Sequence, residues 1–445
     1  MGGAVLNWIW LGLILLAVVY GAFTGRMQEV SAASFDGAKS AVQLVIGLTG
    51  FMVFMLGLMR VATDGGLLRA VARGIAPMMR RLFPEVPPEH PAMAAMVMNF
   101  ATNVLGLGNA ATPFGLKAMR ELETLNRHPG VASDSMVLFL SINATAITLF
   151  PPTGTMAVRA AAGSAAPEAI WVPTLIATTC STLTAVVVFY LLRGWPRYAA
   201  RPLADAPVST PPPAASSAAA ANDEIERALR GPVESAGPAR RALVAVVSVA
   251  LLLGLSLEAA RRLSTQAAGD VATSMLQSWL FPVLIVSLLL VGVSGRARVY
   301  ESMVEGAKEG LEVVVRILPY LVAILVAVAM FRASGALDLV ISLLAPLTTP
   351  LGFPAEALPM ALLRPLSGSG AFAVMSEIVT VYGPDSFIGN LACTIQGSTE
   401  TTFYVLTLYY GASGTRNIRH TLVACLVGDV AGVVGATAAC HAFFG

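Results

Sequence analysis

Apolar stretches of roughly 18–23 residues recur along the whole chain, and each could cross a hydrocarbon core about 30 Å thick. Only 12% of the 445 residues are charged, against about 25% in soluble domains. The pattern predicts an all-α, polytopic helical membrane protein, with the lipid bilayer as its first partner. The spans that we expect lie near residues 5–23, 41–59, 133–151, 170–192, 242–259, 276–294, 312–331, 386–410 and 418–440.

Two further apolar stretches, 92–118 and 357–380, are rich in glycine, proline or asparagine and do not read as simple spans. Irregular backbone at membrane depth is tolerated only where it is buried in protein or lines a watery cavity. These stretches therefore predict broken or re-entrant helices rather than continuous ones.

One long polar segment, residues 196–241, interrupts the apolar pattern and is dominated by proline, alanine and serine. This composition is typical of a flexible linker, here expected on the cytoplasmic side, with one short helix at DEIERALR. The linker divides the chain into a first membrane repeat, 1–195, and a second, 242–445.

The two repeats share sequence features at a fixed offset. DGAK begins at Asp36 and EGAK at Glu305, 269 positions later, and the same offset aligns Gly66 with Gly335. The order of apolar, glycine-broken and polar-centred segments also recurs, which indicates an internal duplication.

The distribution of basic residues indicates how the repeats are oriented. The loop before span 41–59 holds Arg26 and Lys39, whereas the segment after it, 60–83, holds five arginines. Around span 312–331 the bias is reversed: three basic residues precede the span, and Arg332 alone follows it within 332–356. Because basic residues favour the cytoplasmic side, this reversal predicts inverted repeats.

Polar residues in the two glycine-rich stretches are the first candidates for a binding site. Broken helices would aim their freed backbone groups and end dipoles at a common point near the midplane. The alternative is close helix packing through small residues. The candidates here are Asn99, Asn103 and Asn109 in the first stretch, and Ser367 and Ser369 in the second.

A second set of candidates follows in SINATAIT and TIQGSTETT. With a small shift in alignment, Asn143 falls opposite Gln396, and the two carboxamides would face one pocket from opposite sides. A carboxamide both donates and accepts hydrogen bonds, so it suits a polar solute, uncharged ones included. Thr145, Ser398 and Thr399 accompany them.

Glu400 is the acid of this second set, and a charge at the membrane centre costs about 2.5–3.5 kcal/mol. Three states are open to it: protonation, an ion pair with Arg364, or binding of a coupling cation or proton. We therefore assign ion or proton coupling to Glu400 and Arg364. Asp429 is a second intramembrane acid.

Several function classes are disfavoured by the sequence. It contains no P-loop, no HExxH and no GxSxG motif, so we expect no enzyme activity. Its four cysteines and four histidines show no metal spacing, and we expect neither metal nor cofactor. No basic tract suggests binding to nucleic acid.

The motifs resemble a known family. MNFATN and GLGNAATPFGLKAM, residues 98–103 and 106–119, look like spore maturation protein A, whereas RPLSGSGA, QGSTETTFYVL and RNIRH look like spore maturation protein B. The chain is similar to a fusion of the two, which belong to the nucleoside-recognition or Gate domain group. The resemblance implies an integral membrane protein that moves a small solute or ion. It leaves a role in sporulation open for the fused form.

Together these features favour a secondary transporter in the bacterial inner membrane, with a midplane site for a small polar solute or ion. The alternatives are a non-transporting scaffold or regulator, in which the polar clusters serve packing, and a passive channel. A homo-oligomer also stays open, because no residue pattern sets the oligomeric state.

Overall fold

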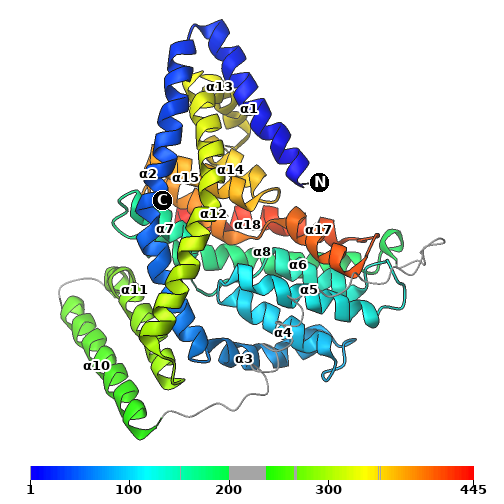
Figure 1. Ribbon diagram of the computed structural model, residues 1–445, viewed down its shortest axis with the longest axis vertical. Coiled ribbons are helices and arrows are strands. Elements are labelled where there is room, and N and C mark those ends of the chain that lie inside the picture. Colours follow the sequence, from blue (N-terminus) through cyan, green and yellow to red (C-terminus); the bar gives the residue numbers. More distant parts are fainter. Residues whose placement is uncertain (1, 151, 200–236, 265–267, 349, 351) are drawn as a thin grey trace.

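A computed structural model of the protein describes residues 2–150, 152–199, 237–264, 268–348, 350 and 352–445, and nearly all of these residues are in helices (Figure 1). Their only β-type pairing is an isolated parallel bridge between Val131 and Asn417. The predicted linker lies mostly outside the described residues. The helices of the first repeat are α1 (Gly2–Thr24), α2 (Met27–Asp64), α3 (Leu67–Leu82), α4 (Pro91–Val104), α5 (Gly108–Thr124), α6 (Asp134–Ala144), α7 (Thr153–Ala161) and α8 (Trp171–Leu192).

The second repeat has a matching series after one additional helix, α10 (Pro238–Leu263). Short 3-10 turns at Pro167–Ile170, Pro196–Tyr198 and Ala355–Ala357 complete the described helices of the chain. The series is α11 (Ala268–Ser294), α12 (Val299–Ala333), α13 (Ala336–Thr348), α14 (Leu358–Leu363), α15 (Gly368–Tyr382), α16 (Phe387–Ser398), α17 (Thr402–Ser413) and α18 (Thr421–Phe444).

Five described helices are long and apolar enough to cross a membrane: α2, α8 with its preceding turn, α10, α12 and α18. The spans predicted at 41–59, 170–192, 242–259 and 312–331 fall within four of them, and the span predicted at 418–440 overlaps α18, which begins at Thr421. The glycine-rich stretches are broken as predicted, into α4 and α5 around Leu105–Leu107 and into α14 and α15 around Arg364–Ser367.

The predictions of continuous spans at 133–151 and 386–410 were wrong, because the helix of the first segment ends at Ala144 and the second segment is unwound between Ser398 and Thr402. Non-local hydrogen bonds hold the unwound backbone. The Leu149 N–H donates to the Val104 carbonyl at 2.8 Å, and the Glu400 N–H donates to the Ala144 carbonyl at 2.8 Å. Both acceptors lie in the last turn of a helix, where carbonyls have no partner within their own helix.

The two long helices α2 and α12 lie side by side along the vertical axis of Figure 1. Gly37 of α2 packs on the C-terminal half of α12, and Gly306 of α12 packs on the C-terminal half of α2, so the helices are antiparallel. The nearest neighbours of Gly37 are residues 325, 326 and 329, and those of Gly306 are residues 56, 57 and 60. Each set maps onto the other at the 269-residue offset, and the repeats are therefore inverted.

Other helices of each repeat also pack against the opposite repeat. Helix α1 packs on α12 of the second repeat, and α11 packs on α2 of the first. Helices α8 and α18, the last of each repeat, also pack on each other. Helix α10 has no buried residue and contacts mainly α11. Apart from this helix, the two repeats form one interlocked body.

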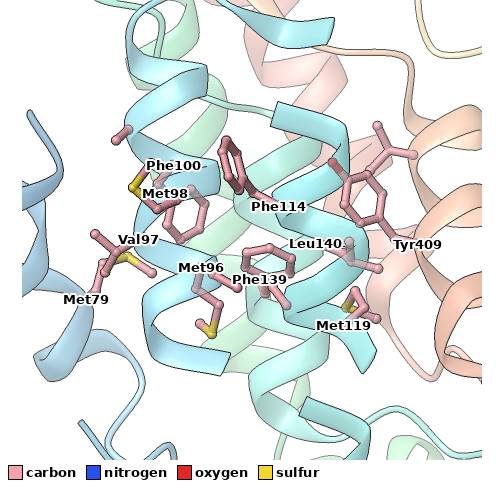
Figure 2. Packing of buried hydrophobic residues seen from close by; sticks show 14 of the residues in the cluster. Met79, Met96, Val97, Met98, Phe100, Phe114, Met119, Phe139, Leu140 and Tyr409 are labelled. Atoms are coloured by element: carbon pink, nitrogen blue, oxygen red, sulfur yellow. The ribbon is translucent and has the colours of Figure 1, made fainter. Parts of the chain in front are cut away.

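The α4–α5 hairpin is held by a buried aromatic cluster, part of which is shown in Figure 2. Phe100 of α4 lies 5.4 Å from Phe139 of α6, between ring centroids, and Phe139 lies 6.4 Å from Tyr409 of α17. Gly115 allows Tyr409 to lie against α5, because a Cβ at this position would be 1.9 Å from the tyrosine ring. The hairpin of the first repeat thus rests on a broken helix of the second.

Two arginines also join the repeats. Arg159 of α7 is 1% exposed and pairs with Asp385, which precedes α16, at 2.9 Å. Arg419, which precedes α18, pairs with Asp134 at the start of α6 at 2.5 Å. Each arginine also donates to a backbone carbonyl just before the same helix, Arg159 to Pro384 and Arg419 to Ala132. The two contacts are reciprocal, because each arginine belongs to the repeat opposite its partner.

Candidate functional site

A polar cavity of about 470 Å³ lies where the broken segments of both repeats converge. Met52 of α2 and Val313 and Ile317 of α12 form part of its apolar wall. Its polar lining comes from all four helix breaks. The lining residues from the breaks and the half-helices beside them include Asn103, Gly106, Thr112, Asn143, Thr148, Thr153, Thr155, Arg364, Gly368, Ser369, Gln396, Thr399, Glu400, Thr401, Tyr404 and Tyr409.

The first repeat supplies a ladder of carboxamides. Asn103 Nδ2 donates to Asn143 Oδ1 at 2.9 Å, which ties the end of α4 to the end of α6. Asn143 Nδ2 donates to the Phe139 carbonyl at 2.8 Å. These bonds engage the buried amide of Asn143 and the half-buried amide of Asn103, which both line the cavity.

The second repeat supplies a buried cation. The Arg364 side chain is 7% exposed, and it lies at the break between α14 and α15. It donates to the Thr399 carbonyl and, at 3.3 Å, to the Thr401 hydroxyl. The unwound segment between α16 and α17 therefore supplies neutral oxygens to the guanidinium.

Glu400 lies beside this arginine but makes only a loose ion pair with it. The closest distance, from Arg364 Nη2 to Glu400 Oε2, is 3.9 Å, and the Glu400 side chain is 51% exposed. Gln396 lines the same cavity, and its Oε1 is buried with no hydrogen-bond partner in the described part of the chain. The site thus holds a carboxylate and an amide oxygen that remain available.

The structure brings most of the predicted site residues to this one cavity. Those that line it are Asn103, Asn143, Arg364, Ser369, Gln396, Thr399 and Glu400. Asn109 belongs to α5, but its side chain is outside the described ones.

Four predicted residues do not line the cavity, because each uses its side chain to hold backbone near a break. Asn99 is fully buried and donates to the Ala111 carbonyl at 2.9 Å. Thr145 and Ser398 donate to carbonyls within the helices that they end, those of Ser141 and Ile395. Ser367 caps α15 by accepting from the Gly370 N–H at 3.1 Å.

The sequence analysis missed the N-terminus of α7, with Thr153 and Thr155, and the tyrosines of α17. Two prolines, at positions 151 and 152, precede Thr153, and a proline before a helix is a recognised start signal. Nothing in the sequence marked Tyr404 or Tyr409, which reach the cavity because α17 begins at the break.

Asp429 lies outside the cavity lining, on α18. It is 5% exposed, and its Oδ2 accepts a hydrogen bond from the Thr402 hydroxyl at 2.7 Å. Asp429 therefore anchors the first residue of α17. No cluster of three or more histidine, cysteine or acidic side chains that could hold a metal occurs among the described residues.

Comparison with known proteins gives consistent matches. Residues 45–192 and 314–416 match the Gate family, described as nucleoside recognition. Spore maturation protein B of Bacillus subtilis (strain 168) is 47% identical over 166 residues, which are 37% of this chain and 93% of that protein. Spore maturation protein A of the same organism is 42% identical over 190 residues, 42% of this chain and 96% of that protein.

Among solved structures, the chain is similar to the YdaH transporter of Alcanivorax borkumensis, whose crystal structure is described as having an unusual topology. The alignment covers 99% of this chain and 98% of that chain, with a TM-score of 0.39 and 15% sequence identity.

Proposed function

The chain belongs to the nucleoside-recognition Gate family, and from that premise we propose that it is a secondary transporter of a small polar solute or ion. It is a multi-pass membrane protein, and we place it in the bacterial cell membrane. The observation that carries the proposal is the cavity itself, which is lined by helix breaks from both inverted repeats. Unwound backbone beside a polar cavity is the usual form of a transport site.

Alternating access would exchange the environments of the two repeats around this cavity. Inverted repeats suit such an exchange, because each repeat can adopt the conformation of the other. This swap would close the cavity on one side of the membrane and open it on the other. The Arg159–Asp385 and Arg419–Asp134 contacts support it, since each ties one repeat to the start of a broken helix of the other. We propose that the two contacts open in turn as access alternates.

The scaffold and channel alternatives make different predictions in a reconstituted system. Proteoliposomes are exposed to a mixture of cell metabolites under an imposed proton or sodium gradient, and their contents are then measured by mass spectrometry. A transporter accumulates at least one solute above its outside concentration, whereas a channel only equilibrates solutes. A scaffold gives no uptake above that of protein-free liposomes.

Glu400→Gln is the matched variant for this experiment. It removes the charge that we assign to coupling while keeping the size of the side chain, and the half-exposed position tolerates the change. We expect folded protein that no longer accumulates the solute or no longer depends on the gradient. Normal gradient-driven accumulation by this variant would contradict the coupling role of Glu400.

A further inference from the structure

We infer that the solute is a small organic anion, and that Arg364 and the N-terminal turns of α7 and α15 hold its carboxylate. This inference rests on the proposed transport function and names the class of solute for the same cavity. Three groups of donors support it, and they come from both repeats.

The first group is the start of α7. Its N-cap residue, Pro152, provides no side-chain cap, and Thr153, Gly154 and Thr155 all line the cavity. Within the described residues, the N–H groups of these three residues have no hydrogen-bond acceptor. A helix N-terminus with free N–H groups carries a partial positive charge and favours an anion.

The second group is the start of α15. The Ser367 side chain caps only the Gly370 N–H, and Gly368 and Ser369 line the cavity. This helix start is next to that of α7, because a Cβ at Gly154 would lie 3.3 Å from the ring of Phe372, in the second turn of α15. Two helix N-termini therefore face one cavity from the two repeats.

Arg364 is the third and independent group. It is buried and lines the cavity, and among the described residues its Nε has no hydrogen-bond partner. In the described part of the chain, no carboxylate accepts a hydrogen bond from this guanidinium, because its acceptors are the Thr399 carbonyl and the Thr401 hydroxyl. Glu400, at 3.9 Å, is too far away to accept a hydrogen bond, so a carboxylate of the solute would supply the hydrogen-bonded anion that this buried guanidinium lacks.

Glu400 allows the charge of the solute to be tested, because replacing it should change solute binding in opposite directions for an anion and a cation. Its carboxylate lies 3.9 Å from Arg364 and lines the same cavity, so it repels an anion that approaches the guanidinium. Replacing Glu400 by glutamine should therefore strengthen the binding of an anion. The same change would weaken the binding of a cationic solute, which Glu400 attracts.

The test uses the purified full-length protein in detergent and follows thermal stabilisation by carboxylates and by their neutral amides. The probes are benzoate and succinate, compared with benzamide and succinamide, and adenosine serves as a neutral nucleoside. We expect stabilisation by a carboxylate and none by the matching amide. Arg364→Gln should weaken this binding by about tenfold to a hundredfold, the cost of a charge-assisted hydrogen bond, and Glu400→Gln should strengthen it.

A second pair of variants tests the helix N-terminus without removing a buried charge. Thr153→Pro deletes one N–H at the first helical position, where proline is tolerated, and Thr153→Val keeps that N–H while losing the hydroxyl. We expect carboxylate binding about fivefold weaker in Thr153→Pro than in Thr153→Val. Equal binding by the two variants would contradict the role of α7.

The outcomes separate this inference from the transport function. Equal thermal stabilisation by amides and carboxylates, or no stabilisation by either carboxylate, contradicts the inference that the solute is an organic anion. Accumulation of a neutral or cationic solute by proteoliposomes also contradicts it, while the transport function stands. Carboxylate binding without accumulation of any solute contradicts transport and supports the anion site.

Discussion

Gly37 of α2 and Gly306 of α12 occupy equivalent positions, and each lies against the backbone of the other helix. A Cβ at Gly37 would be 3.0 Å from the Leu325 carbonyl oxygen, and one at Gly306 would be 2.6 Å from the Leu56 carbonyl oxygen. This reciprocal approach defines the pseudo-two-fold relation of the repeats. It also packs α2 and α12 closely against each other beside the cavity.

Gly306→Ala should destabilise the protein, because the added methyl group meets backbone of α2 that cannot rotate away. Overpacking of this kind typically costs about 1–3 kcal/mol. Gly50→Ala, on α2, is the matched control, since its Cβ would have no neighbour within 4 Å. Thermal unfolding in detergent should show a lower Tm for Gly306→Ala alone, and equal Tm values would show that the helices do not pack this closely.

Gln396→Ala and Asn103→Ala should separate a binding site from a packing cluster. Gln396 Oε1 has no hydrogen-bond partner in the described part of the chain, so its loss should change the Tm little while lowering solute binding or uptake. Asn103→Ala breaks the 2.9 Å bond to Asn143 and should cost about 1–3 kcal/mol. Strong destabilisation by Gln396→Ala, together with no solute binding or uptake by the natural protein, would favour the scaffold alternative.

Asp385 should make stability depend on pH in the acid range. Burial acts to raise its pKa, but hydrogen bonds from Ser164 and from the Ala165 N–H, with the charge of Arg159, hold the pKa below its ordinary value. A pKa lower in the folded state stabilises the protein above the unfolded pKa of about 3.9, and this stability is lost as pH falls through the folded pKa. Asp385→Asn should therefore lower the Tm at pH 6, and the difference from the natural protein should shrink below about pH 4. A Tm difference between the two proteins that grows on acidification would contradict the assignment of a lowered pKa to Asp385.

His420 should act in a separate and higher pH window. Its ring is stacked on Phe189 and tilted against Tyr198, and both ring nitrogens lack hydrogen-bond partners within the described residues. Burial, together with the nearby charge of Arg419, lowers its pKa to about 4. A folded pKa below the unfolded value of about 6.5 means that stability falls as pH drops from about 6.5 to 4. His420→Phe should keep the fold at pH 7 and remove this fall. An unchanged profile of Tm against pH in the variant would contradict the assignment.

Hydropathy was sufficient to predict the long spans, because α2, α12 and α18 are apolar over whole membrane widths. Glycine, proline and asparagine were sufficient to predict the breaks at Leu105–Leu107 and Arg364–Ser367. The breaks after Ala144 and Ser398 could not be found in the same way. They lie in the polar segments SINATAIT and TIQGSTETT, which were predicted to stay helical within longer apolar spans. The unwound backbone is held by the Leu149 and Glu400 N–H groups, whose acceptors are on other helices.

The candidate site was predictable in its residue types more than in its contacts. Asn143 and Gln396 do line one cavity, as expected for equivalent positions of inverted repeats. Arg364 donates its hydrogen bonds to the unwound backbone and to the Thr401 hydroxyl, because the break exposes oxygens nearer than those of Glu400. The pairing of buried Arg159 with half-exposed Asp385 joins residues 226 apart and had no sequence signal.

The central claim is that the cavity opens to both sides of the membrane in turn, and two cysteine variants of α15 test it without knowledge of the solute. In a Cys180→Ser background, Ser369→Cys lies in the cavity, whereas Ser376→Cys lies fully buried away from it on the same helix. The account predicts that a membrane-impermeant thiol reagent modifies Ser369→Cys when added on either side, and Ser376→Cys from neither. Modification of Ser369→Cys from one side only, or from neither, would contradict it.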